Sequence, residues 1–434
     1  MSMLDSTVAN LAIESIRKDL SSTLSVVQWV ATGYLCALAV SLPAAAWLGV
    51  RYGYGRLWGS SVAAFVLASI LCAVAPDTLT LITARLIQGL AGGLMVPAGQ
   101  AVIGSTVEKR QLGRIFGTLG LVIALGPAVG PALGGFLLDA ASWRWLFWIN
   151  VPIGVIALVA ARGLVPRGEC DSGRMLDIQG LVLLSMGLPL LLYGAFETGL
   201  AEISQTAVVA LVAGSALVAV FVFSAFRSRS PLIKLRLLNR AAFSAATITT
   251  ALTGVNMYAG LLLVPLYLQL VAGMESTSTG LWLLVMGLGS ALVLPIAGSL
   301  TDRFGARIVS LAGAGLLLAS TIPFIFPDVP SATLLAVLFV ARGGGVALAQ
   351  MPAMTSAYTA VSGDEMGDAT TLVNIAQRVG GAIGAAGVVI VIKHTGGSSS
   401  ITAHNIAFAS LAAISALTVV TAWLMQSYQN TDPG

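Results

Sequence analysis

The sequence contains very few charged residues. Only 9% of its 434 residues are Asp, Glu, Lys or Arg, whereas 57% are hydrophobic, and the mean hydropathy is +0.93. A soluble chain of this length could not cover its surface with so few charges. The net charge of +4 does not indicate a nucleic-acid partner, because the basic residues are scattered over short loops. We therefore expect a protein embedded in a membrane.

Residues that carry catalytic chemistry are scarce as well. The three cysteines form no Cys-x-x-Cys pair and no cluster with histidine, which argues against a disulfide framework and a metal site. A membrane enzyme would need clustered His, Asp or Glu, and the only two histidines, His394 and His404, flank one loop. No Gly-Lys dipeptide occurs, so the phosphate-binding loop of ATP-driven pumps is missing. We predict no cofactor, no metal and no catalytic residue, and transport that is passive or driven by a gradient.

Long apolar runs are abundant. Thirteen of them have about the length needed to cross a bilayer. They lie at 26–49, 57–76, 80–103, 114–138, 145–164, 176–197, 204–226, 242–271, 278–300, 307–327, 331–355, 369–393 and 403–426.

The start of the chain holds a fourteenth, defective candidate, residues 3–16. Its fourteen residues would span about 21 Å of a hydrocarbon core that is roughly 30 Å thick. We interpret it as a truncated first helix, with a half-helix that enters the bundle only partly as the alternative. Within it, Glu14 precedes Arg17 and Lys18 by three and four residues, which predicts a solvated ion pair.

The basic loop residues are distributed unevenly. If alternate loops face the cytoplasm, one set of loops holds fifteen Lys and Arg and the other holds four. Because cytoplasmic loops carry an excess of basic residues, both chain ends are expected in the cytoplasm. We predict a multi-pass protein of the bacterial inner membrane.

Two parts of the chain resemble each other. The segment 47–53 ends one span, and 299–305 ends another 252 residues later, while Arg85 recurs as Arg342. Parallel internal repeats are typical of transporters built from two similar halves. The predicted fold is therefore an all-α membrane protein with two pseudo-symmetric six-helix bundles and two extra helices between them. The expected boundaries are 1–164, 165–240 and 241–434.

A doubled Gly-Pro sequence lies inside an apolar run at 126–135. Interior prolines break soluble helices but are tolerated in membrane helices, where neighbouring groups satisfy the freed backbone. Glycines four residues apart also let another helix approach closely, so simple helix packing is the alternative to a functional motif. The motif residues are Gly126, Pro127, Gly130, Pro131, Gly134 and Gly135.

The joint order of five segments resembles the fourteen-span drug:proton antiporter branch of the major facilitator superfamily. The segments are 4–10, 85–89, 126–135, 143–154 and 377–384. This resemblance covers nearly the whole chain. It implies a monomeric efflux transporter that exchanges protons for hydrophobic, cationic or weakly basic compounds by alternating access. A dedicated exporter of one secondary metabolite and an inactive truncated remnant are the alternatives.

The resemblance assigns proton coupling to Asp5 and Arg85. A carboxyl inside the membrane can change its charge, and a charge within a span indicates function by default. A helix-capping role for Asp5 and carbonyl binding by Arg85 are the structural alternatives. Two departures concern this half of the chain: Val50 stands where the family usually has Asp, and Glu14 stands where it has proline.

Two further sets of residues complete the expected machinery. Charged pairs around the short loops would form a cytoplasmic gate that holds one alternating-access state. The predicted gate residues are Arg51, Gly53, Asp302, Arg303, Gly305 and Arg307. Polar and aromatic residues would line a substrate cavity between the halves, with core packing as the alternative. These residues are Asn10, Tyr34, Gln88, Met257, Tyr258, Tyr267 and Arg378.

Overall fold

The computed structural model is helical throughout the residues that it describes, with no strand among them. These residues are 5, 12–121, 134, 137–138, 141–168, 170–171, 173, 175–197, 205–228, 230–397 and 400–425. Within them, eleven helices are long and apolar enough to cross a membrane, or twelve if one bent pair counts as a single span. The chain is therefore an all-α, multi-pass membrane protein, as its apolar runs predicted.

The first half of the chain forms α2 to α10. The described elements are α2 (Ile13–Asp19), α3 (Leu24–Val27), α4 (Trp29–Ser41), α5 (Ala44–Tyr52), α6 (Tyr54–Ala73), α7 (Thr78–Thr106), η1 (Lys109–Gln111), an apolar helix Leu112–Leu121, α9 (Trp145–Trp148) and α10 (Asn150–Leu164). The expected span 26–49 is not straight, because α4 and α5 meet at 57°. Pro43 stands at this bend, where its ring removes a backbone donor.

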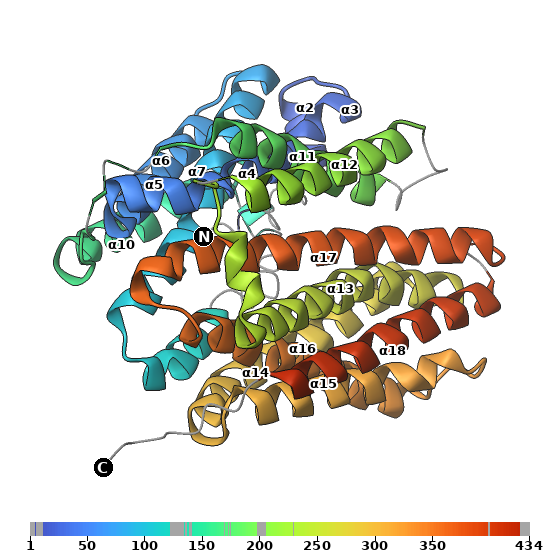
Figure 1. Cartoon of the computed structure of the whole chain (residues 1–434). Helices are drawn as coiled ribbons and strands as arrows, with labels where there is room; N and C mark the ends of the chain where they lie inside the picture. Colours follow the sequence, from blue (N-terminus) through green and yellow to red (C-terminus); the bar gives the residue numbers. More distant parts are fainter. Residues whose placement is uncertain are drawn as a thin grey trace, which may run out of the picture.

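The second half forms α13 to α18. Its elements are α13 (Ala241–Leu270), α14 (Ser276–Phe304), α15 (Ala306–Thr321), η3 (Ile322–Ile325), α16 (Ala332–Thr359), η4 (Gly363–Glu365), α17 (Met366–His394) and α18 (Ile401–Leu424). Figure 1 shows these helices as one group of neighbours, beside the group formed by the first half. The exact division of the chain into three parts stays a prediction.

Two additional helices lie between the halves, as expected. They are α11 (Ile178–Glu197) and α12 (Gln205–Arg227), and Figure 1 shows them running side by side. A Cβ atom on Gly214 would lie 2.5 Å from the backbone nitrogen of Leu191, so the two helices touch backbone to backbone. The hydroxyl of Ser185 donates to the carbonyl of Val40 at 2.8 Å, which fixes α11 against α4.

Small residues set the closest helix contacts in the second half. A Cβ atom on Gly254 of α13 would lie 2.4 Å from the carbonyl oxygen of Gln377 in α17, and one on Gly380 would lie 2.2 Å from that of Ala251. In lipid, helices associate through such close packing and not through the hydrophobic effect. This contact fixes the position of α17, which carries Arg378.

The short helix α2 confirms the predicted ion pair. Glu14 lies 2.8 Å from Arg17 and 3.6 Å from Lys18, with all three side chains in contact with solvent. Hydrogen bonding to Arg17 lowers the pKa of Glu14 to about 2.

Candidate functional site

Arg85 lies fully buried in α7 and forms an ion pair with Asp5. Its Nη1 donates to Oδ2 of Asp5, and its Nε donates to the carbonyl oxygen of Val30 at 2.9 Å. The Asp5 side chain is only 1% exposed. The contact predicted from the sequence between these two groups is therefore present, although its role in proton coupling stays a prediction.

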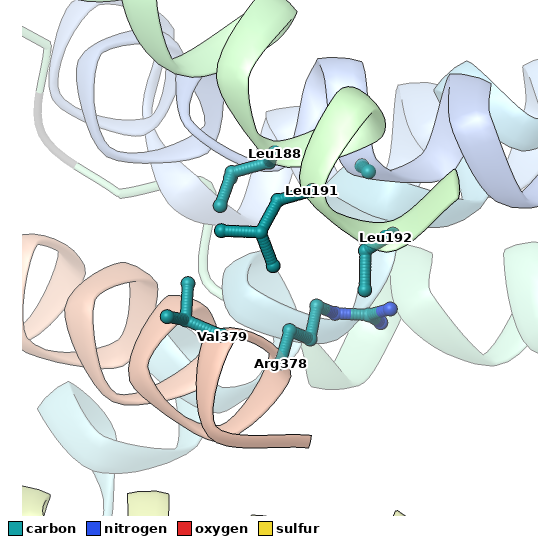
Figure 2. A pocket seen from close by; sticks show the side chains of 6 residues that line it. Leu188, Leu191, Leu192, Arg378 and Val379 are labelled. Carbon is teal, nitrogen blue, oxygen red and sulfur yellow. The ribbon is translucent and has the colours of Figure 1, made fainter. Parts of the chain in front are cut away.

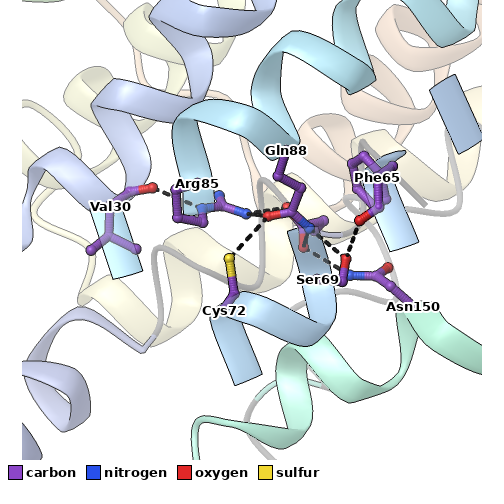
Figure 3. Close-up of polar contacts among 8 residues, drawn as sticks. Val30, Phe65, Ser69, Cys72, Arg85, Gln88 and Asn150 are labelled. Atoms are coloured by element: carbon purple, nitrogen blue, oxygen red, sulfur yellow. Dashed lines mark hydrogen bonds and ion pairs between the residues drawn. The ribbon is translucent and has the colours of Figure 1, made fainter. Parts of the chain in front are cut away.

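Three amide and hydroxyl side chains complete this cluster, as Figure 3 shows. One turn beyond Arg85, Gln88 accepts from Arg85 Nη1 at 2.7 Å and donates to Asp5 Oδ1 at 3.2 Å and to Ser69 Oγ at 2.7 Å. Asn150, at the start of α10, donates to Asp5 Oδ1 at 2.9 Å. The carboxylate thus accepts from one guanidinium and two amides, which together compensate a charge that burial alone would make costly.

Aromatic rings cover the guanidinium. The Cζ atom of Arg85 lies 4.2 Å from the ring centroid of Tyr34 and 5.5 Å from that of Phe147. Both distances suit cation–π attraction, which is strongest where water is excluded. Tyr34 and Gln88, expected to line a substrate cavity, are therefore fully buried parts of the Asp5 cluster. Neither of their side chains faces a described pocket.

The second half has a corresponding cluster without a carboxylate. Arg342 of α16 is 2% exposed, and it donates to Thr321 Oγ1 at 2.8 Å and to the carbonyl oxygen of Asn256 at 3.0 Å. The side-chain oxygen of Asn256 accepts from Ser415 at 2.7 Å. Arg342 therefore has the carbonyl-binding arrangement that the sequence left open for the span arginines.

Arg378 of α17 faces the space beneath α11. It lines one small cavity with Leu188, Leu191 and Leu192 (Figure 2), and a second of about 70 Å³ that includes Tyr258. No hydrogen bond or ion pair to Arg378 occurs within the described part of the chain. Arg378 and Tyr258 thus share a cavity, and the substrate-binding role predicted for them stays a prediction.

The other expected cavity residues lie elsewhere. Tyr267 is 1% exposed inside the second half, because its ring packs edge-on against Phe324 at 5.4 Å and Phe408 at 5.5 Å between centroids. The structure therefore corrects its predicted place at the cavity to one in the core. Met257 is partly buried and lines none of the described pockets. Asn10 lies outside the described residues.

The Gly-Pro motif is described at one position only. Gly134 is helical and buried. Its companions Gly126, Pro127, Gly130, Pro131 and Gly135 lie outside the described residues, so the role predicted for them stays a prediction.

Asp302, one of the predicted gate residues, contacts the first half through backbone groups, and its role as a gate stays a prediction. Asp302, near the end of α14, accepts the backbone N–H groups of Gly113 at 3.1 Å and Arg114 at 2.9 Å, in the first turn of the helix Leu112–Leu121. A carboxylate at a helix N-terminus satisfies free donors and the helix dipole together. Arg303 and Arg307 lie against the rings of Phe304 and Trp423, so the expected pairing with Asp302 is corrected.

The two short loops share one backbone feature. Gly53 and Gly305 adopt φ values of +88° and +85°, which favour glycine and end α5 and α14 sharply. Arg51 lies over the ring of Trp47, 5.8 Å from its centroid. The loop after α10 covers this turn, because the N–H of Asp171 donates to the carbonyl oxygen of Val50 at 2.9 Å.

Contacts between the halves gather at one end, which we name the basic-loop end because residues 51–56, 109–114, 227–240 and 303–307 lie there. The amide oxygen of Gln100 accepts from Tyr358 at 3.2 Å and from Asn374 at 2.6 Å. Lys109 donates to the carbonyl oxygen of Thr359 at 2.8 Å. Between 12–164 and 241–425, hydrogen bonds are found only at this end of the described helices. The structure is therefore closed at the basic-loop end.

The family model described as Major Facilitator Superfamily matches residues 1–385 and 246–431. The chain belongs to the major facilitator superfamily. It is 35% identical over 409 residues to the "Multidrug resistance protein B homolog" of Mycobacterium tuberculosis, covering 93% of this chain and 76% of that protein. It is also 31% identical over 386 residues to "Multidrug resistance protein Stp" of the same species, covering 88% of this chain and 72% of that protein.

Two solved structures share the fold. The proton:xylose symporter XylE has a TM-score of 0.67 at 12% identity, covering 99% of this chain and 94% of that one. The human organic anion transporter MFSD10 has a TM-score of 0.61 at 13% identity, covering 98% and 97%. Together with the multidrug-resistance relatives, these matches support a transporter of the multidrug type in this superfamily.

Proposed function

We propose that this chain exports hydrophobic compounds in exchange for protons by alternating access. The observation that carries the proposal is the buried Asp5–Arg85 pair. Among the described residues, Asp5 is the carboxylate that forms an ion pair with a fully buried arginine. We infer that a proton crossing the protein binds to this side chain.

The cluster can couple protonation to a change of shape. An ionised Asp5 holds α7 and α10 together, because it accepts from Arg85, Gln88 and Asn150 at once. A protonated carboxyl loses the charge that attracts the guanidinium, so the same contacts become weak. A shift of α7 against α10 within the first half then separates the groups. The neutral and ionised forms of Asp5 thus favour different packings of the first-half helices, and this change in packing accompanies the rocking of the halves seen in related transporters.

The structure represents the alternating-access state in which the basic-loop end is closed. Asp302, Gln100 and Lys109 seal the side that the distribution of basic loops assigns to the cytoplasm. In this state Asp5 is buried and paired with Arg85, and we infer that it exchanges protons with the opposite side of the membrane once the pair separates. Opening of the gate transfers access to the cytoplasm, where cargo enters.

The charges of the buried and half-buried side chains indicate which charge an exported compound can carry. A cationic cargo, expected from the resemblance, needs a carboxylate, and Asp5 is free for one only after it leaves Arg85. Arg342 and Arg378 add two positive charges within the spans, and neither has a carboxylate partner in the described helices. Because unpaired charges are costly inside a membrane, the balance favours neutral or anionic polar groups on the exported compounds.

Inside-out vesicles with an imposed pH gradient test the proposal. Wild type should accumulate a hydrophobic fluorescent dye only when the vesicle interior is acidified, and Asp5→Asn should abolish this accumulation. Asp77→Asn is the matched control, because Asp77 is an exposed N-cap of α7 and Asn caps equally well. An anionic, a neutral and a cationic dye are compared under the same gradient.

The uptake results test proton exchange at Asp5 and the charge of the cargo separately. If wild type shows no uptake that depends on acidification, or if Asp5→Asn behaves as wild type, proton exchange at Asp5 is rejected. If only the cationic dye is transported, the inference about cargo charge is rejected and proton exchange stands.

A further inference from the structure

A cavity of about 300 Å³ opens where the linking helices join the second half, at the basic-loop end. It lies between the end of α12, the start of α13 and the short turn before α17. Its lining residues are Ala225, Ser228, Pro231, Lys234, Leu235, Arg236, Leu237, Arg240 and Glu365. The residues that line this cavity are far in the sequence from the Asp5 cluster. None of them takes part in the contacts of Asp302 with Gly113 and Arg114.

Sequence alternation explains why the rim of this cavity is basic. In the segment 232–237, the side chains of Leu232, Ile233, Leu235 and Leu237 are at most 3% exposed, whereas Lys234 and Arg236 point outward and are exposed. The buried leucines join the main hydrophobic core, which anchors the segment. The cations between them are thereby held at a fixed place on the surface.

Two of the three cations that line the cavity have a carboxylate partner among the described residues, and the third has none. Arg240 binds Glu365 through two hydrogen bonds of 2.6 and 2.8 Å. The Nζ atom of Lys234 lies 3.9 Å from the buried carboxylate of Asp368. Arg236 forms no hydrogen bond or ion pair with any residue that the structure describes. Among the described cations that line the cavity, Arg236 is therefore the one without a carboxylate partner.

The surface beside the cavity is apolar. Phe223 and Phe226, in the last turns of α12, are 58% and 44% exposed. Because α12 is long and apolar enough to cross a membrane, we expect these rings to lie beside acyl chains near the cavity. The guanidinium of Arg227 lies over the ring of Phe223, 3.7 Å from its centroid, and adds a further cation here. A cationic cavity above exposed aromatic rings matches a molecule with a charged head and an apolar tail that lies along the bilayer.

We propose that this cavity binds the phosphodiester headgroup of an anionic phospholipid from the cytoplasmic leaflet. Arg236 and Lys234 hold the phosphate, and one acyl chain lies along Phe223 and Phe226. A phosphodiester carries one negative charge, which can pair with the guanidinium of Arg236. Basic pockets at the cytoplasmic ends of membrane helices suit such headgroups, and a guanidinium pairs with phosphate oxygens with good geometry.

A phospholipid bound in this cavity affects the contacts between the two halves through α17. Arg240 and Lys234 both contact the first turns around the start of α17, through Glu365 and Asp368. The same helix carries Asn374, which donates to Gln100 across the halves. A phospholipid that orders the segment 231–240 therefore stabilises the closed basic-loop end.

Titration of the purified full chain in nonionic detergent tests the site. Calorimetry measures the affinity for phosphatidylglycerol, for phosphatidylcholine with the same acyl chains, and for inorganic phosphate. We expect Lys234→Gln with Arg236→Gln to weaken phosphatidylglycerol binding about fivefold for each cation removed. Arg162→Gln is the matched control, because Arg162 is an exposed cation at the end of α10 outside the cavity. Its affinity should stay within about twofold of wild type.

Single substitutions keep the test decisive if the double variant is unstable. Arg236 has no described partner, so Arg236→Gln leaves the fold intact, and Arg236→Lys should retain most of the affinity. The proposal is overturned if Arg236→Gln binds phosphatidylglycerol as wild type does, or if phosphatidylcholine binds equally well. It is also overturned if inorganic phosphate competes at the concentrations at which the lipid binds, since the ligand would then be a free anion. None of these readouts depends on transport.

Discussion

Asn256 binds the buried arginine of the second half through its backbone carbonyl oxygen, whereas Asp5 binds that of the first half through its carboxylate. Each residue contacts the arginine of the corresponding helix, Arg342 or Arg85. Each also accepts from a polar side chain of the last helix in its half, Ser415 or Asn150. The two clusters have the same plan, but only the first contains a group that can lose a proton. The internal repeat thus preserves the polar framework, and one half alone carries the carboxylate.

This asymmetry predicts different costs for the two clusters. Asp5→Asn leaves the buried guanidinium of Arg85 without its counter-charge, which costs about 3–5 kcal/mol in comparable buried pairs. Ser415→Ala removes one neutral hydrogen bond to Asn256, for which about 1 kcal/mol is typical. We expect a large fall in the thermal unfolding midpoint for Asp5→Asn and a small one for Ser415→Ala. Adding Arg85→Gln to Asp5→Asn should restore part of the loss. Equal falls for the two single variants would contradict the assignment.

The helices α14 and Leu112–Leu121 approach each other closely across the two halves, backbone against backbone. A Cβ atom on Gly298 of α14 would lie 2.4 Å from the carbonyl oxygen of Gly113 and 3.0 Å from the Cα atom of Arg114. Backbone atoms cannot move aside as a flexible side chain would, so Gly298→Ala should hold the basic-loop end open. Gly287→Ala, on the same helix, is the matched control, because nothing lies within 4 Å of its Cβ position.

Spin labels at two exposed positions measure the opening. Gln111 and Asp364 lie on opposite halves at the basic-loop end. Their label distance should lengthen in Gly298→Ala and stay as in wild type for Gly287→Ala. An unchanged distribution in both variants would show that this contact does not limit closure.

Asp302 provides the third prediction. Asp302→Ala removes both acceptors from the N–H groups of Gly113 and Arg114 and leaves that helix end uncapped. A loss of about 1–3 kcal/mol shifts the closed-to-open ratio by roughly 5-fold to 150-fold. The same pair of labels should report a larger open population. Arg303→Gln serves as control, since Arg303 lies against Phe304 of its own helix. A larger open population in Arg303→Gln than in Asp302→Ala would instead support the ion pairing of Asp302 with Arg303 that the sequence predicted.

The sequence predicted what depends on composition and on charged side chains. Apolar runs located the spans, and the cost of burying a charge brought Asp5 and Arg85 together. It could not identify the partners of Asp302, because backbone N–H groups have no signature in side-chain identity. Asn150 and Ser69 were missed for a related reason: amides and hydroxyls are common in membrane helices, and only the fold shows which of them converge. Asn150 nevertheless lay inside the family-like segment 143–154.

Tyr267 illustrates the limit for aromatic residues. A tyrosine on a membrane helix fits a binding cavity and a packed core equally well by sequence. Its environment of Phe324, Phe408 and His404 results from the packing of α13 against both η3 and α18, which no local pattern encodes. Arg378, in contrast, was recognisable because a charged group in a span must face a partner or a cavity.

The last prediction uses the pH dependence of stability. Asp19, at the end of α2, accepts from Arg144 Nη1 at 2.6 Å and from Trp143 Nε1 at 3.0 Å. Hydrogen bonding to Arg144, and then to Trp143, holds the pKa of Asp19 below its usual value near 3.8. A carboxyl whose pKa is lower in the folded state stabilises the fold above the unfolded pKa and loses this contribution as pH falls through the folded one.

We therefore expect Asp19→Asn to lower the unfolding midpoint at pH 7, by an amount that reflects about 1 kcal/mol or less, because the pair is partly exposed. The difference from wild type should shrink as the pH is lowered from 4 towards 2. Asp328→Asn is the control, since Asp328 is exposed and forms no bond with a described residue. It should match wild type at every pH. A difference for Asp19→Asn that grows on acidification would show that the carboxylate at position 19 does not anchor α2 to the segment before α9.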